Sequence, residues 1–402
     1  MMAMAWGASY TYGVFFDALL GEFRWTRAVT STAYSLSTLL YGIFSIITGR
    51  LTDRLGPRAV GTICSILLGA GLLLLSLTTA VWQLLLFYGV LFGIGIGGFW
   101  APTLSPVARW FTTRRGLMTG IVSSGIGIGT LVIVPLVSHS ISSLGWRKSY
   151  LIMGAAVLVI TVVASQFLKR DPQQMGLQPY GSGDIKQNSA RPSVDFSFQE
   201  TIHFRQFWML CGIYFSYGFY LCTVAVHIVT HATGLGIAAV SAANILAISG
   251  GMGIAGRIMV GSASDRLGAR PSIMLAITLM AAGLVWLLFA RDLWTFYLFA
   301  IVFGFGYGSL SALQASATAE LFGVRSVGII MGCFSFSYTI GGAVGPVLAG
   351  YIFDSTKSYT PAFIICVIIS IAGLILALLL SPARKEAGND QRRSAGIGKS
   401  QR

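Results

Sequence analysis

One arginine stands out among the residues whose chemistry could be useful, because Arg257 interrupts a long uncharged stretch. It lies eight residues before Asp265, where that stretch ends, so a helix would place it about 12 Å from the end. Holding an arginine in hydrocarbon costs about 2.5–3.5 kcal/mol, and charges found there are functional by default. A planar guanidinium can donate two parallel hydrogen bonds to a carboxylate. Arg257 therefore predicts a binding site for a small organic anion.

No acid of the sequence is expected at the depth of Arg257. Asp17, Glu320 and Asp354 all fall toward the ends of their apolar stretches. A structural alternative is that Arg257 caps the carbonyls of a broken helix, or extends its charge to the membrane surface. We favour the anion site, because a cation without a protein partner is expected to face an aqueous cavity.

Aromatic and hydroxyl side chains in other apolar stretches are candidates to line the same cavity. Tyr307 and Ser311 are one helical turn apart and share a face. Phe99 and Trp100 precede Pro102, and a broken helix exposes backbone groups that a ligand can use. Further candidates for substrate binding are Thr103, Tyr10, Tyr338 and Asn244. Packing, or contact with lipid, is an equally good interpretation of any single aromatic residue.

Metal and covalent chemistry find little support. His227 and His231 are spaced to share a helix face, but no Cys, Asp or Glu accompanies them, and zinc needs at least three protein ligands. We interpret them as packed interfacial histidines, with a pH-sensitive gate as the alternative. The glycine runs at 93–98 and 125–129 follow no strand and are not nucleotide loops. We therefore expect no metal, no cofactor and no enzymatic site.

The composition indicates which solvent surrounds these residues. Of 402 residues, 55% are apolar and 10% charged, whereas a soluble protein has about 25% charged residues. The charges cluster between apolar runs of about 20 residues, the length that a helix needs to cross a bilayer. These runs do not alternate, which excludes a membrane barrel. The net charge of +14 flanks the runs and forms no stripe with aromatics, so we expect a lipid bilayer and no nucleic acid as partner.

The pattern predicts an all-α membrane protein with twelve transmembrane helices in two six-helix bundles. The expected spans are 1–20, 29–49, 59–79, 83–107, 116–141, 149–168, 206–231, 238–263, 272–290, 293–318, 326–352 and 360–380. The expected domains are an N-terminal bundle 1–168, a cytoplasmic linker 169–205, a C-terminal bundle 206–381 and a basic cytoplasmic tail 382–402. The first run lacks a polar lead, so we expect a short first helix.

The distribution of bases predicts the orientation. With the N-terminus in the cytoplasm, most Lys and Arg lie on the cytoplasmic side. The loop bases on the other side are Arg24, Arg27, Arg147, Lys148, Arg291 and Lys357. The positive-inside rule then places both termini in the cytoplasm, and we expect a monomer in a bacterial inner membrane.

An internal repeat carries the strongest signal. GRLTDRLGPR (49–58) recurs as GSASDRLGAR (261–270), and ARWFTTRRGLMTG (108–120) aligns with ELFGVRSVGIIMG (320–332) at the same offset of 212 residues. A parallel duplication of six spans produces this pattern. The repeated loop resembles the signature of the major facilitator superfamily, and that resemblance implies a gating latch. Its residues are Gly49, Asp53, Arg54, Gly56, Arg58, Asp265, Arg266, Gly268 and Arg270. A pure topology signal is the alternative.

Further motifs resemble the bacterial monocarboxylate-porter and oxalate/formate-antiporter branches. They are YGVFF (12–16), RWFTTRRG (109–116), DPQQMGLQPYG (171–181) and HIVTHATGLGI (227–237). The resemblance implies that Arg257 binds a carboxylate. Gly253 stands where mammalian monocarboxylate porters carry an Asp linked to proton coupling, the region of Tyr10 lacks their Lys, and Phe334 replaces a second cation of oxalate antiporters. One cavity cation favours a single-carboxylate substrate.

Three functions remain open at this point. The first is a secondary active transporter of small organic anions, most simply monocarboxylates, that works by alternating access with proton symport or anion exchange. The second keeps the fold and exports amphipathic compounds through an aromatic cavity. The third is a non-transporting sensor with a transporter-like fold.

Overall fold

The structure is a computed structural model that describes residues 1–110, 115–178, 180, 196–322 and 327–380. In the first half the helices are α1 (Met2–Tyr10), α2 (Tyr12–Phe23), α3 (Arg27–Leu55), α4 (Pro57–Leu75), α5 (Val81–Leu84), the π-helix η1 (Leu85–Phe92), α6 (Gly93–Gly97), α7 (Trp100–Trp110), α8 (Arg115–Leu144) and α9 (Trp146–Gln166). Two short helices follow, the 3₁₀-helix η2 (Pro172–Met175) and α10 (Phe198–Thr201). The second half holds α11 (Arg205–Gly234), α12 (Ala239–Leu267), α13 (Ala269–Leu287), α14 (Leu293–Phe322), α15 (Val327–Thr356) and α16 (Thr360–Leu379).

The described chain has the helices of a multi-pass membrane protein. Eleven spans of described residues are long and apolar enough to cross a bilayer. The first expected span is covered by α1 and α2, which meet at Thr11. The Thr11 hydroxyl donates to the Ala8 carbonyl at 2.7 Å, while its N–H still bonds Gly7, so the chain continues in nearly helical form. The expectation of an all-helical membrane fold is confirmed.

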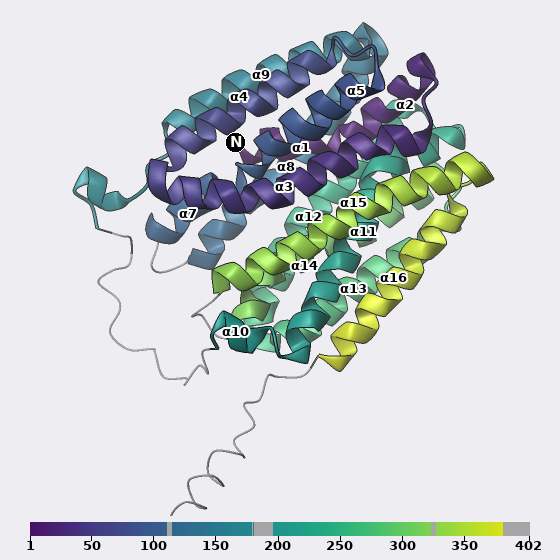
Figure 1. Cartoon of the computed structure of the whole chain (residues 1–402). Coiled ribbons are helices and arrows are strands. Elements are labelled where there is room, and N and C mark those ends of the chain that lie inside the picture. Colours follow the sequence, from purple (N-terminus) through teal and green to yellow (C-terminus); the bar gives the residue numbers. More distant parts are fainter. Residues whose placement is uncertain (111–114, 179, 181–195, 323–326, 381–402) are drawn as a thin grey trace, which may run out of the picture.

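The helices of the two halves gather into two groups (Figure 1). Within the first group α4 packs on α9 and α1 on α8, and within the second α12 and α13 pack on α14 and α11 on α15. Among the described residues, the main contacts between the groups join α3 with α15, α8 with α12, and α2 with α11. A cavity between the groups is therefore bordered by helices from both halves.

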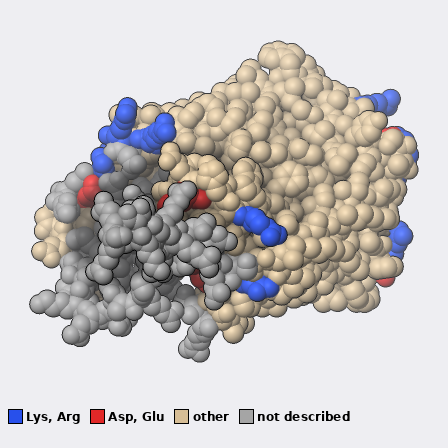
Figure 2. Space-filling view, turned by 60° about the horizontal axis from the view of Figure 1, so that its bottom comes forward, with Lys and Arg blue, Asp and Glu red and all other residues tan. Residues whose placement is uncertain are grey.

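Charged side chains gather at two opposite ends of the molecule, with a broad uncharged surface between them (Figure 2). Large apolar side chains of the long helices α3, α8, α9 and α16 are exposed, among them Ile46, Ile121, Val159 and Ile368. In water such exposure would be unfavourable, whereas lipid tails are as apolar as these side chains. The surface therefore suits a bilayer.

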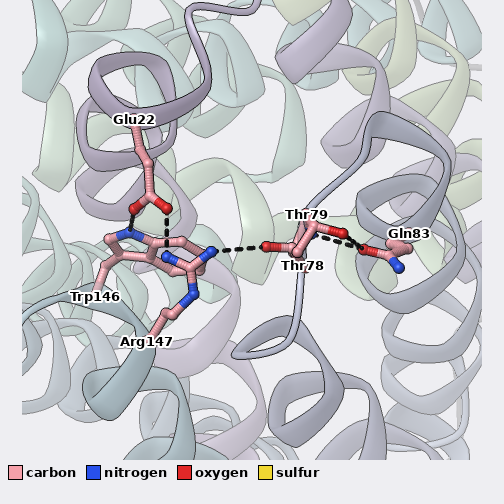
Figure 3. A network of polar contacts seen from close by, with 6 residues as sticks. All are labelled: Glu22, Thr78, Thr79, Gln83, Trp146 and Arg147. Atoms are coloured by element: carbon pink, nitrogen blue, oxygen red, sulfur yellow. Dashed lines mark hydrogen bonds and ion pairs between the residues drawn. The ribbon is translucent and has the colours of Figure 1, made fainter.

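A polar network fastens one end of the first helix group (Figure 3). The Glu22 carboxylate at the end of α2 accepts hydrogen bonds from the indole of Trp146 and the guanidinium of Arg147, at the start of α9. Arg147 also donates to the Thr78 carbonyl at 3.1 Å, and the next residue, Thr79, bonds the side chain of Gln83 in α5. The end of α2, the turn between α4 and α5 and the start of α9 are thereby held together.

Candidate substrate site

A cavity between the two helix groups encloses about 650 Å³ of space, part of it open to solvent. Its lining is mostly aromatic, with one charged side chain and a few hydroxyl and amide groups. The lining residues are Trp6, Tyr10, Tyr41, Trp100, Ile126, Tyr214, Tyr217, Leu221, Arg257, Tyr307, Ser311, Gln314, Ser335 and Tyr338. Both halves of the chain contribute, so the cavity changes shape if the halves move.

Arg257 is held in the cavity wall by α14. Only 6% of its surface is exposed. Its Nε–H donates to Ser311 Oγ at 3.0 Å, and its Cζ lies 5.6 Å from the centroid of the Tyr307 ring. That distance is within the range of a cation–π contact. Ser311 and Tyr307 therefore fix the orientation of the guanidinium.

One terminal nitrogen of Arg257, Nη1, remains available. Its Nη1 is buried and has no hydrogen-bond partner among the described residues, where no carboxylate pairs with the guanidinium either. A buried donor without a partner is costly, and more so when it is charged. The arrangement is that of an anion site with one guanidinium end left for the ligand.

Close approach of α12 and α14 brings Arg257 and Tyr307 together. A Cβ added at Gly308 would lie 2.0 Å from the Gly253 carbonyl oxygen, so the two backbones are in contact there. A Cβ at Gly253 would lie 2.8 Å from both Cζ and Oη of Tyr307. The Tyr307 ring thus occupies the space that a side chain at 253 would need. Tyr217 of α11 adds a hydrogen bond to the Tyr307 carbonyl at 3.1 Å.

Gly253→Ala should therefore lower both thermal stability and transport. Overpacking a well-packed site costs about 1–3 kcal/mol, and here the displaced group is Tyr307 beside Arg257. Thermal unfolding in detergent and uptake in proteoliposomes measure the two effects. Gly251→Ala is the matched control, because its Cβ would meet nothing closer than Leu131 at 3.4 Å. If the double variant with Tyr307→Ala recovers no stability, the overlap is not the cause.

Six of the candidate residues line one cavity, namely Arg257, Tyr307, Ser311, Trp100, Tyr10 and Tyr338. Three are elsewhere. Phe99 is fully buried in the core of the first half. Thr103 donates to the carbonyls of Phe99 and Trp100, and Asn244 lies in α12 outside the cavity lining. Substrate contact by any of these residues remains a prediction.

Several lining residues escaped the sequence analysis, chiefly Trp6, Tyr41, Tyr214, Tyr217 and Gln314. The repeat offers one signal for them, since the offset of 212 residues places Tyr41 opposite Gly253, one turn before Arg257. The same face of the second helix in each half thus borders the cavity. Gln314, which donates to Met331 O and Ser335 Oγ, lies one turn beyond Ser311.

The molecule is closed at the end where α2 and α11 terminate, which we call the closed end. Asp354 of α15 accepts hydrogen bonds from the backbone N–H groups of Arg27 and Ala28, at 3.1 and 2.9 Å. Thr233 of α11 donates to Asp17 of α2 at 2.7 Å. Each bond joins the first half of the chain to the second, so this end cannot open without breaking them.

His227 lies fully buried in the closed end. Its Nε2 donates to the Pro346 carbonyl at 2.9 Å and lies 3.3 Å from Ser31 Oγ. Its Nδ1 then accepts from Tyr359 Oη at 3.1 Å, and Tyr359 accepts from Arg27 Nε at 3.0 Å. Both ring nitrogens are occupied, which agrees with a packed histidine. No three potential metal ligands gather within the described ranges.

Comparison with known proteins decides the family. The model of the Major Facilitator Superfamily matches residues 1–269 and 208–401. The chain belongs to this superfamily. It is a multi-pass membrane transporter, and members of the family are transporters rather than enzymes.

Individual relatives are distant. Monocarboxylate transporter 13 of Rattus norvegicus is 28% identical over 377 residues, covering 92% of this chain and 84% of the relative. The uncharacterized MFS-type transporter YhjX of Escherichia coli is 26% identical over 341 residues, covering 84% and 82%. A solved bacterial homolog of the human lysosomal transporter Spinster, inward-facing and unoccupied, has a TM-score of 0.72 at 16% identity, covering 95% and 97%. The last likeness shows the fold alone.

The repeated loop of this transporter is described in part. Gly56 and Gly268 have φ of 86° and 87° and immediately precede α4 and α13, a conformation that favours glycine. Arg58 donates to Gln166 at 2.7 Å, and Arg270 donates to the Leu378 carbonyl. The side chains of Asp53, Asp265 and Arg266 lie outside the described part of the chain. The gating role of the loop, including Gly49 and Arg54, remains a prediction.

Proposed function

We propose that this transporter carries small monocarboxylates and binds their carboxylate with Arg257. The observation that supports the proposal is the buried guanidinium, oriented by Ser311 and Tyr307, with Nη1 unpartnered among the described residues. A carboxylate would accept hydrogen bonds from this end and neutralise the charge. Relatives named monocarboxylate transporters support the same substrate class.

The cavity supports a preference for small acids with one carboxylate. Arg257 is the cationic side chain in its lining, and aromatic side chains make up most of the rest. A second carboxylate would lose its hydration without gaining a cation. A short organic tail would instead contact the aromatic rings.

Alternating access follows from this arrangement. We propose that the transporter works as a monomer in which bundles 1–168 and 206–381 move as units. The closed end then faces away from the cytoplasm. The N-terminus, the linker and the tail then lie on the cytoplasmic side, and a bacterial inner membrane suits the charge pattern. Transport is coupled either to proton symport or to exchange with another anion.

The aromatic lining favours export of amphipathic compounds as a second candidate function. Trp6, Tyr41, Trp100 and Tyr214 could stack on flat apolar ligands without help from Arg257. The two functions differ in their dependence on that cation.

A substrate panel in proteoliposomes tests the proposal. Labelled monocarboxylates of two to six carbons should show saturable uptake, and dicarboxylates of equal length should compete at least about tenfold less well, because the second charge is buried unpaired. Uptake driven by an imposed pH gradient indicates proton symport, and uptake that needs an internal acid indicates exchange. Export of amphipathic dyes without uptake of any acid would contradict the proposal.

A further inference from the structure

A second hollow lies where α3 ends, α4 begins and α9 ends. It comprises about 600 Å³ of space, part of it open to solvent, shares no lining residue with the substrate cavity and is mostly polar. Four of its lining residues are cationic, namely Arg54, Arg58, Lys169 and Arg170, and the others are Leu55, Gly56, Pro57 and Leu168.

The positive charge of this hollow is only partly compensated. Arg170 Nε lies 3.3 Å from a carboxylate oxygen of Asp171. Arg58 donates to the uncharged amide of Gln166. Within the described ranges no carboxylate pairs with Arg54, Arg58 or Lys169. Three cations therefore surround a space large enough for an anionic group.

The internal repeat shows what such a position holds in the other half. At the start of α13 the Ala269 N–H donates to a carboxylate oxygen of Glu320 at 2.7 Å. A Cβ at Gly268 would lie 3.4 Å from the other oxygen of this carboxylate. The second half thus supplies its own anion to the positive end of a helix.

Among the described side chains, the equivalent helix start in the first half has no such anion. A Cβ at Gly56 would meet no described atom within 4 Å, so the space that Glu320 fills beside Gly268 is open here. At the offset of 212 residues the position of Glu320 is taken by Ala108, which has no carboxylate. Where the second half places the Glu320 carboxylate, the first half has a basic hollow.

Apolar side chains beside the hollow indicate where the anion comes from. Leu55, which lines it, is 58% exposed, and Phe167, next to the lining residue Leu168, is 78% exposed. Hydrocarbon tails would cover both, whereas a soluble anion would leave them bare. We propose that the hollow binds the phosphate group of an anionic phospholipid, in place of the carboxylate that Glu320 supplies in the other half. Basic pockets at helix ends suit such headgroups.

Native mass spectrometry of the full chain in detergent, titrated with phosphatidylglycerol, tests this site. Phosphatidylcholine with the same acyl chains is the zwitterionic comparison. We expect one phosphatidylglycerol to bind at least about tenfold more tightly than phosphatidylcholine, and the double variant Arg54→Gln, Arg58→Gln to lose that preference. Arg270→Gln, the counterpart of Arg58 at the Glu320-capped helix, should retain it.

A folding check, a replacement variant and a phosphate control complete the experiment. Thermal unfolding without lipid checks that the variants fold. If the double variant does not fold, Lys169→Gln replaces it, because the Lys169 side chain is exposed. Its expected loss is about fivefold. Equal binding of both lipids, or no loss in a folded variant, overturns the proposal. If inorganic phosphate alone stabilises the chain as much as phosphatidylglycerol does, the site takes a soluble anion and the lipid assignment is wrong.

Discussion

Arg257→Ala should abolish saturable uptake of monocarboxylates while leaving the protein folded. Truncating one partner of a buried hydrogen-bonded charge pair costs about 2–5 kcal/mol, so uptake at low substrate concentration should fall about 30-fold or more. Initial rates in proteoliposomes, normalised to reconstituted protein, measure the effect. The stabilisation that monocarboxylates give the wild type in thermal unfolding should vanish as well.

The stability of the variant without ligand separates a binding role from a structural one. Because Nη1 of Arg257 is buried and has no partner among the described residues, removal of the charge should leave the unfolding temperature unchanged or raise it. A structural arginine would instead lower it. Arg257→Lys should recover little uptake, because an ammonium cannot reproduce the planar fork. Unchanged uptake in Arg257→Ala would rule out this anion site.

Ser311→Ala is the graded comparison. It removes the hydroxyl that accepts from Arg257 Nε but keeps the charge in the cavity. Its effect should be smaller than that of Arg257→Ala, because one hydrogen bond to a charged group contributes about 1.5–3 kcal/mol and the freed Nε can turn to the substrate. The ranking of the two variants tests whether Ser311 positions the cation.

Much of the fold could be predicted because the thickness of the bilayer sets the length of each apolar run in the sequence. A run of about 20 apolar residues is readable without knowledge of its neighbours. The division of the first span at Thr11 is a local feature of the backbone, where the Thr11 hydroxyl bonds the Ala8 carbonyl. The π-helix Leu85–Phe92 similarly changes the hydrogen-bond register without changing hydropathy. Neither feature leaves a mark in composition.

The cavity could be predicted only where a residue is unusual in hydrocarbon. Arg257 is detectable because charge is rare there, and Tyr307 with Ser311 follows from helical spacing. Tyr41 and Tyr214 are ordinary aromatics, and only packing between the halves turns them toward the cavity. The partners of His227 come from three other segments, so no spacing in the sequence reveals them.

Alternating access itself can be tested at the closed end. A Cβ at Gly13 of α2 would lie 2.4 Å from the Ala225 carbonyl oxygen and 3.2 Å from that of Val226, both on α11. The two halves can come this close only because Gly13 has no side chain. Opening this end separates α2 from α11 and would remove the overlap. A large side chain at this position should therefore favour the open arrangement.

Gly13→Trp should trap the transporter open at this end. An overlap worth about 3 kcal/mol would shift the equilibrium about 100-fold, so uptake should fall by a similar factor. Ligand-induced thermal stabilisation should persist, because Arg257 is untouched. In a background without native cysteines, Ser31→Cys reports the opening: Ser31 is fully buried in the closed end, and an impermeant maleimide should label it much faster when Gly13→Trp is present.

Gly21→Trp provides the matched control on the same helix. No described atom lies within 4 Å of a Cβ at Gly21, so the same indole can be added there without pushing α2 from α11. This variant should transport normally and leave the labelling rate of Ser31→Cys as slow as in the parent. Normal uptake by Gly13→Trp, with the cysteine still protected, would mean that α2 and α11 do not form the gate. Loss of uptake together with loss of ligand stabilisation would instead indicate damage to the fold.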